Sequence, residues 1–331
     1  MKSLSIIISG GLFLTSLVFG QNAANTSRRI DSSKAVEPQA LQVAKQNKSK
    51  KGGSKDLSES DTGAQRPILL KTKGISAFFG YDSKYYYQSN PFATTGVLKS
   101  EIATGVWRNT FYGGAGLGVY DMDSYVLTPY IGGSWSVVDY LKSDDLLEAQ
   151  NYNSTSAYAL LLAQFGNGWS AKAGVRYGND RTSENDQEVF KEFYPSIGIM
   201  KTDSFSDSLR SSLEVGLGYH NNSVDPLFAD DNGKDDSKRN WDISASYSLE
   251  KTISVFTITP KYKLTYRDYK NGSNKDRDDL VHELSATANY SVTESLMLKL
   301  SYGYTNQDAS IDTFDYENYD AGGSLTLNAR F

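Results

Sequence analysis

The stretch YDAGGSLTLNARF, residues 319–331, alternates between apolar or small side chains and polar or small side chains up to its last residue. One set contains Tyr319, Ala321, Gly323, Leu325, Leu327, Ala329 and Phe331, and the other contains Asp320, Gly322, Ser324, Thr326, Asn328 and Arg330. Successive side chains of a β-strand point to opposite sides, so this period of two predicts a strand with one apolar and one polar face.

The same alternation recurs upstream. The clearest further segments are 168–178, 208–220, 241–250, 255–267 and 295–306. They match or exceed the roughly 9–11 residues that a tilted strand needs to cross a bilayer. Their aromatic side chains sit mostly at the ends of the apolar face, with aliphatic side chains between them, which is typical of strands that span a membrane. We therefore expect the apolar faces to contact lipid.

Weaker strand patterns complete an all-β chain. They cover 75–86, 97–107, 111–120, 125–138, 152–165, 188–201 and 279–292. From residue 139 on, long polar links alternate with short ones, as in an up-and-down antiparallel barrel. Upstream this rhythm fails, because 108–110 and 121–124 both read as tight turns. The patterns add up to thirteen strands, whereas bacterial single-chain barrels have even numbers. We predict about twelve strands, with fourteen as the second choice.

The N-terminal part differs from the rest. Lys2 precedes an apolar run from Leu4 to Phe19, and the small residues Val18 and Gly20 suit cleavage before Gln21. A helical membrane anchor is the alternative, but the run is short for a span of about 20 residues. We expect a signal peptide over 1–20, a disordered basic periplasmic tail over 21–66 and a barrel over 67–331. The chain has no cysteine, which excludes disulfides and thiolate metal sites.

Together, the leader, the aromatic-flanked strands, the rhythm of short and long links and the closing strand resemble a bacterial outer-membrane β-barrel of porin-like architecture. The resemblance covers 74–331 and is architectural. It implies a Gram-negative outer membrane with its lipids as surroundings, and insertion by the barrel-assembly machinery. That machinery would read the last strand, whose assembly-signal residues are Tyr319, Leu325, Leu327 and Phe331.

Function in such a barrel would lie in the lumen or the loops, because the outer face needs only to be apolar. The candidates for lining a pore are Lys172, Arg176, Arg210, Glu214, Lys261, Lys263, Arg267, Glu283 and Lys299. Eight-stranded barrels are filled by side chains and those with 16–18 strands hold a channel, so twelve to fourteen strands allow a narrow pore. Unpaired lumen cations would favour small anions. A lumen plugged by paired charges is the alternative.

Catalytic and metal chemistry have weak support in the sequence. His220 falls on the lumen phase and His282 on the apolar phase, and a hydrolase would need a serine or acids such as Asp225 beside His220. We expect a rim histidine with no catalytic role, no enzyme activity and no cofactor. Acidic residues cluster in two external loops, Asp225–Asp236 and Asp276–Asp279, and we expect them to be solvated rather than to bind Ca²⁺. No nucleic-acid signal appears.

These observations favour a passive or weakly selective channel that transports small solutes. The alternative is a non-conducting barrel that presents its acidic extracellular loops for adhesion, envelope structure or partner binding. An outer-membrane hydrolase, which would rest on His220 alone, is the third hypothesis.

Overall fold

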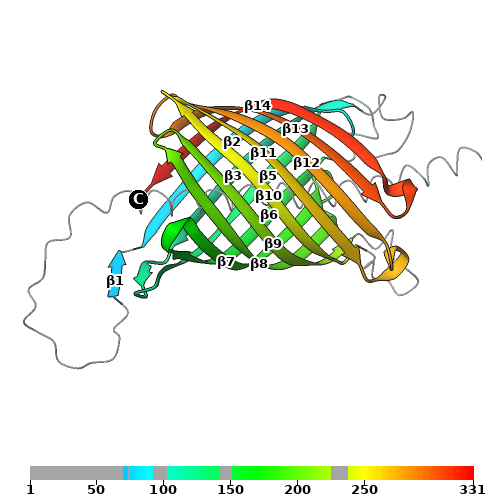
Figure 1. Ribbon diagram of the computed structural model, residues 1–331. Coiled ribbons are helices and arrows are strands. Elements are labelled where there is room, and N and C mark those ends of the chain that lie inside the picture. The colour runs from blue at the N-terminus through cyan, green and yellow to red at the C-terminus, as the bar shows by residue number, and fades with distance from the viewer. Residues whose placement is uncertain (1–69, 74, 92–102, 142–150, 225–237) are drawn as a thin grey trace, which may run out of the picture.

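The computed structural model describes residues 70–73, 75–91, 103–141, 151–224 and 238–331, and these form a closed antiparallel barrel of twelve strands (Figure 1). The strands are β2 (Ser76–Gln88), β3 (Thr104–Gly116), β5 (Tyr125–Tyr140), β6 (Tyr152–Phe165), β7 (Trp169–Thr182), β8 (Glu188–Ser206), β9 (Leu209–Val224), β10 (Asn240–Ile253), β11 (Phe256–Tyr269), β12 (Asp278–Ser291), β13 (Leu296–Ala309) and β14 (Tyr316–Arg330). Each pairs with the next, and β14 closes the ring on β2. The predicted fold class and strand number are confirmed. The predicted signal peptide and tail, 1–66, lie outside the described residues.

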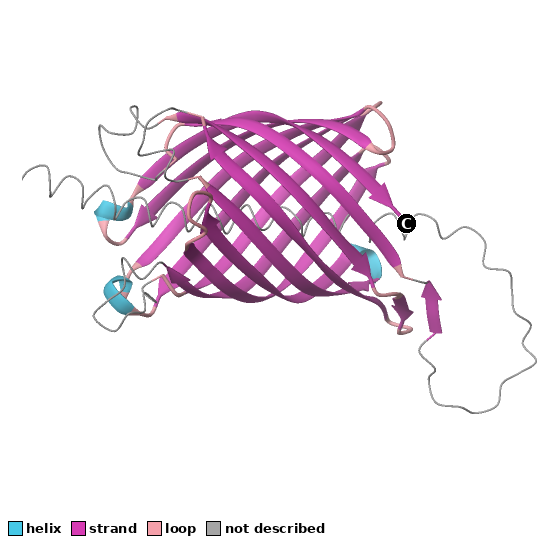
Figure 2. Ribbon diagram, turned by 180° about the vertical axis from the view of Figure 1, so that it is seen from behind, coloured by secondary structure: helices cyan, strands magenta, loops and turns pink. Residues whose placement is uncertain are grey.

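The two ends of the barrel differ. The end that holds the C-terminus carries the short links 166–168, 207–208, 254–255 and 292–295, and we call it the short-turn end (Figure 2). The short strands β1 (Leu70–Lys73) and β4 (Val119–Asp121) pair with each other there and extend the sheet from β5. The opposite, long-loop end carries the helical turns η4 (Gly272–Asn274) and η5 (Asp312–Phe314), while η2 (Gly166–Gly168) lies at the short-turn end. The alternation predicted from residue 139 on is confirmed.

The thirteenth predicted strand was wrong. The segments predicted at 97–107 and 111–120 contribute to a single strand, β3, and the predicted turn at 108–110 lies in its middle. Asn109 is the reason that the sequence resembled a turn there, because it is a polar residue on the outward face. Its side-chain oxygen accepts hydrogen bonds from the hydroxyls of Tyr81 (2.7 Å) and Ser83 (2.9 Å). Residues 92–102 lie outside the described residues.

The outer surface of the ring is apolar. Trp241, Ile243 and Tyr247 of β10 are all exposed, and the same holds along the other strands. Aromatic rings from adjacent strands pack together on this surface: the ring centroids of Tyr219 and Trp241 lie 4.8 Å apart. An apolar surface this continuous is unfavourable in water and matches the hydrocarbon of a bilayer. No helix in the described part of the chain is long and apolar enough to cross a membrane.

Part of the interior is filled by aromatic rings. The Tyr158 ring lies directly over Gly132 on the neighbouring strand, and the Tyr194 ring lies over Gly218 in the same way. A Cβ atom at either glycine would collide with the ring, so only glycine permits these contacts. Tyr130, Leu160 and Leu162 form a buried cluster against Tyr158. The inner wall from β5 to β9 is therefore partly packed rather than uniformly open.

Candidate functional site in the lumen

The structure places the predicted pore-lining side chains on the inward phase of their strands, and pairs several of them with acids. Lys172 forms an ion pair with Glu214 at 2.6 Å, and Lys263 forms one with Glu283 at 2.6 Å. Arg210 lies 4.0 Å from Glu250. Several of the basic side chains that were predicted to line the pore are thus neutralised by acids.

Arg267 and Lys261, on β11, complete the predicted basic wall. Arg267 donates a hydrogen bond to the Gln307 side chain at 3.2 Å and lies directly opposite Asp242 in the sheet register. Lys261 lies opposite Ser285 on β12 and Ser248 on β10. Among the described residues, Lys261 has no carboxylate within ion-pair distance.

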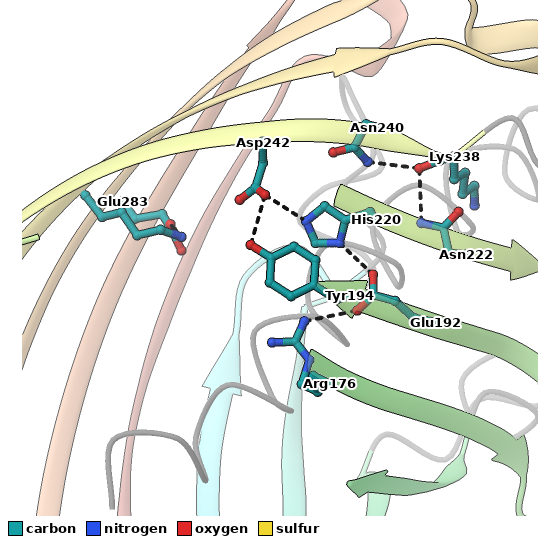
Figure 3. Close-up of polar contacts among 10 residues, drawn as sticks. Arg176, Glu192, Tyr194, His220, Asn222, Lys238, Asn240, Asp242 and Glu283 are labelled. Atoms are coloured by element: carbon teal, nitrogen blue, oxygen red, sulfur yellow. Dashed lines mark hydrogen bonds and ion pairs between the residues drawn. The ribbon is translucent and has the colours of Figure 1, made fainter. Parts of the chain in front are cut away.

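A buried polar network, which we call the histidine cluster, joins four neighbouring strands (Figure 3). It consists of Arg176 (β7), Glu192 and Tyr194 (β8), His220 (β9) and Asp242 (β10), all of them buried. Arg176 donates a hydrogen bond to Glu192 Oε2 at 3.0 Å, and His220 Nδ1 lies 2.6 Å from Glu192 Oε1. The Tyr194 hydroxyl donates to Asp242 at 2.9 Å. Hydrogen bonds and close charge contacts thus link these five side chains, while the buried Arg176 Nε has no hydrogen-bond partner among the described residues.

The His220 ring lies between two carboxylates. Its Nδ1 contacts Glu192, and its Nε2 points at Asp242 Oδ1, 3.6 Å away. The ring packs against Tyr194 with centroids 4.3 Å apart. Both ring nitrogens therefore face carboxylates, and only Nδ1 lies within hydrogen-bond distance of one. His220 is buried within the wall rather than placed at a solvated rim, and Asp225 lies outside the described residues.

The histidine cluster continues toward the long-loop end through backbone contacts. The side-chain amides of Asn222 and Asn240 both donate to the Lys238 carbonyl oxygen, at 3.0 Å and 2.9 Å (Figure 3). These bonds hold the start of β10 against the end of β9. His282, as predicted, faces outward, and its Nδ1 lies 2.8 Å from the Tyr262 hydroxyl.

Asp279 is not a solvated loop acid, contrary to the prediction. It is fully buried and forms a two-pronged ion pair with Arg277, at 2.7 Å and 2.6 Å. The Arg277 guanidinium lies 3.7 Å from the centroid of the Phe314 ring. The acidic loop 225–236 lies outside the described residues. Within the described ranges, no group of three or more His, Asp or Glu side chains is placed to hold a metal ion.

The predicted assembly-signal residues lie on the last strand and the final residue. Tyr319, Leu325 and Leu327 are exposed on the outer face of the barrel, and Phe331 is the most exposed of the four. The Tyr319 ring packs against Tyr304 of β13 with centroids 4.8 Å apart. This geometry leaves an apolar strip along the outside of β14.

Two lumen-facing cations were not among the residues predicted from the sequence. Lys84 of β2 and Arg108 of β3 lie directly opposite each other, and Lys299 of β13 lies in the same row across Ser324 of β14. We call Lys299, Lys84 and Arg108 the cationic row. Arg108 was missed because the sequence assigned it to a turn. Lys84 could have been found from the alternation within 75–86, which places it on the face opposite Tyr85 and Tyr87.

No family model matches the chain, and no curated protein matches it. Solved structures match its fold. An outer-membrane channel from Pseudomonas putida F1 is 13% identical and covers 82% of this chain and 100% of its own, with a TM-score of 0.49. The translocator domain of the autotransporter NalP from Neisseria meningitidis is 10% identical and covers 92% and 96%, with a TM-score of 0.43. The NanC porin is 11% identical and covers 75% and 98%, with a TM-score of 0.43. These likenesses concern barrel architecture and assign no function.

Proposed function

We propose that this protein is an outer-membrane channel through which small solutes diffuse. Support for the membrane comes from the closed ring of strands, which leaves no free edge within the span, and from its apolar exterior. Support for a channel comes from the interior, which is polar and charged over much of its wall.

The partial exposure of two inward ion pairs carries the channel proposal. Lys172 and Glu214 keep 19% and 28% of their side-chain surface exposed, and Lys263 and Glu283 keep 16% and 22%. In the histidine cluster, by contrast, the Glu192 and His220 side chains each keep 2%. All these side chains point inward, so the exposed surface faces the lumen. The inward residues beside these pairs include small ones, Gly216 and Ser246.

The orientation follows from the two ends of the barrel. Short turns face the periplasm in outer-membrane barrels and longer loops face the outside. The short-turn end, which holds the C-terminus, would therefore be periplasmic, and an N-terminal tail preceding β1 would start from the same side. The alternative of a non-conducting barrel rests on the acidic loop 225–236 and stays a prediction.

Single-channel recording tests the proposal. The refolded full chain in a planar bilayer, with a KCl gradient, should give discrete conductance steps. Circular dichroism of the same preparation in vesicles must show β-structure, which establishes that the barrel is folded. A folded, inserted barrel that never conducts would overturn the channel function.

A further inference from the structure

Three cations lie in one row of the inner wall with no acid in that row. The register runs from Lys299 on β13 through Ser324 on β14 and Lys84 on β2 to Arg108 on β3. Residues directly opposite each other in antiparallel strands have their Cβ atoms about 4.5–5.5 Å apart. Lys84 and Arg108 are therefore held side by side by the backbone itself, whatever rotamers their side chains adopt.

Such a pair is unfavourable without a partner of opposite charge. Like charges directly opposite in a sheet are destabilising. Among the described residues, none of the three cations has a carboxylate within 4 Å, although the other inner wall pairs Lys172 and Lys263 at 2.6 Å. Lys172 and Lys263 on the other wall are therefore neutralised by glutamates, whereas no carboxylate in the described ranges contacts the cationic row.

The charges that act most strongly on Lys84 are two acids and two cations, so this group, with Lys84 itself, has one more cation than acid. Asp82 and Asp320 are the acids that act electrostatically on Lys84, and Arg108 and Lys299 are the other cations that do so. Asp82 accepts a hydrogen bond from the Thr326 hydroxyl at 2.6 Å. Three cations against two carboxylates match a single negative charge on a ligand.

A buried hydrogen-bond donor without a partner among the described residues also lies in the cationic row. The Nε–H group of Arg108 is buried and has no hydrogen-bond partner in the described part of the chain. A buried donor without a partner calls for an explanation, and a bound ion or water would supply the missing acceptor. The Tyr86 ring adjoins the row, with Lys84 Nζ 4.4 Å and the Arg108 guanidinium 5.9 Å from its centroid.

We propose that the cationic row, Lys299, Lys84 and Arg108, is a binding site inside the lumen for the carboxylate group of a small monovalent organic anion. The planar guanidinium of Arg108 suits the two oxygens of a carboxylate, and the two ammonium groups add point charges beside it. This inference rests on the proposed channel function and names its solute class: anionic solutes pause at this row on their way through.

Binding of ¹³C-labelled acetate to the full chain, folded in a non-ionic detergent, tests the site without requiring conduction. Line broadening of the acetate signal should saturate with concentration for the native chain. Lys84→Gln and Arg108→Gln should each weaken binding about tenfold, as expected when one charge-assisted hydrogen bond is lost. Lys270→Gln is the matched control, since it removes the same charge from an exposed loop residue that pairs with Asp268. It should leave acetate binding unchanged.

The outcomes separate the site from the channel. Absence of saturable acetate binding to the native chain overturns the site, as does an equal loss of binding in Lys270→Gln, which would indicate a general charge effect. Conductance without acetate binding leaves the channel standing and removes the site. Acetate binding without conductance leaves the site and removes the channel. Circular dichroism of each variant checks that the barrel has folded.

Discussion

Ala77 and Phe331 exchange both of their backbone hydrogen bonds: Ala77 N–H donates to the Phe331 carbonyl oxygen at 3.1 Å, and Phe331 N–H donates to Ala77 at 2.9 Å. They form the last rung of the seam between β14 and β2. An unclosed seam would leave two strand edges in lipid, where unpaired backbone groups are costly. The terminal residue thus completes the ring through its backbone, while its ring stays exposed outside.

Replacement of Ala77 by proline should weaken this seam. Proline removes the N–H that donates to Phe331, and a lost ladder bond in a sheet destabilises it. We expect the folded barrel to lose roughly 0.5–1.5 kcal/mol, the net contribution of a typical hydrogen bond. The urea midpoint of refolded barrels in detergent measures this loss. Ala77→Val keeps the N–H and should shift that midpoint far less; equal shifts would mean that the hydrogen bond contributes nothing.

The sequence predicts whether a side chain faces the lumen or the lipid, but it does not predict which side chain on the neighbouring strand lies beside it. A period of two is enough to assign Lys172, Arg176 and Lys263 to the lumen, because every residue of a strand faces either lipid or the interior. The partner depends on the register between strands. A slip of two residues keeps every side chain on its face and yet exchanges every cross-strand neighbour. The Lys263–Glu283 pair therefore appears only in the structure.

The histidine cluster illustrates the same limit over longer distances. His220 lies 28 residues from Glu192 in the chain, and the two meet because β8 and β9 are adjacent. Sequence alternation placed His220 in the lumen and could not show that two carboxylates flank it. For Arg108 the sequence did not predict even the face of the strand, because Asn109 beside it is a residue type that favours turns.

Replacement of Glu192 by glutamine should be strongly destabilising. It removes the carboxylate that Arg176 and His220 share, and breaking one partner of a buried ion pair costs about 3–5 kcal/mol. The urea midpoint reports this cost. The matched control is Asp186→Asn, which breaks the exposed Arg181–Asp186 pair and should cost less than about 1 kcal/mol. Similar costs for the two variants would show that burial of the cluster adds no energy.

Two inward glycines allow a direct test of ring packing in the lumen. A Cβ atom at Gly132 would strike the Tyr158 ring, whereas one at Gly178 would meet no atom within 4 Å. Gly132→Ala should therefore destabilise the barrel by about 1–3 kcal/mol through overpacking. Gly178→Ala should stabilise it slightly, since alanine loses less conformational entropy in a strand. Thermal unfolding of both variants in the same detergent distinguishes them, and a Gly132→Ala variant as stable as Gly178→Ala would contradict the observed packing.

The Arg277–Asp279 pair can be tested by removing one partner and then both. Arg277→Met leaves the fully buried Asp279 carboxylate without its cation, and we expect a loss of about 3–5 kcal/mol. A second change, Asp279→Leu, removes the stranded charge and should recover most of that loss, because apolar side chains replace a buried ion pair with little cost. The urea midpoints of the two variants and the native chain complete the comparison. If the double variant is no more stable than Arg277→Met, the loss comes from the packing of Arg277 on Phe314 rather than from the unpaired charge.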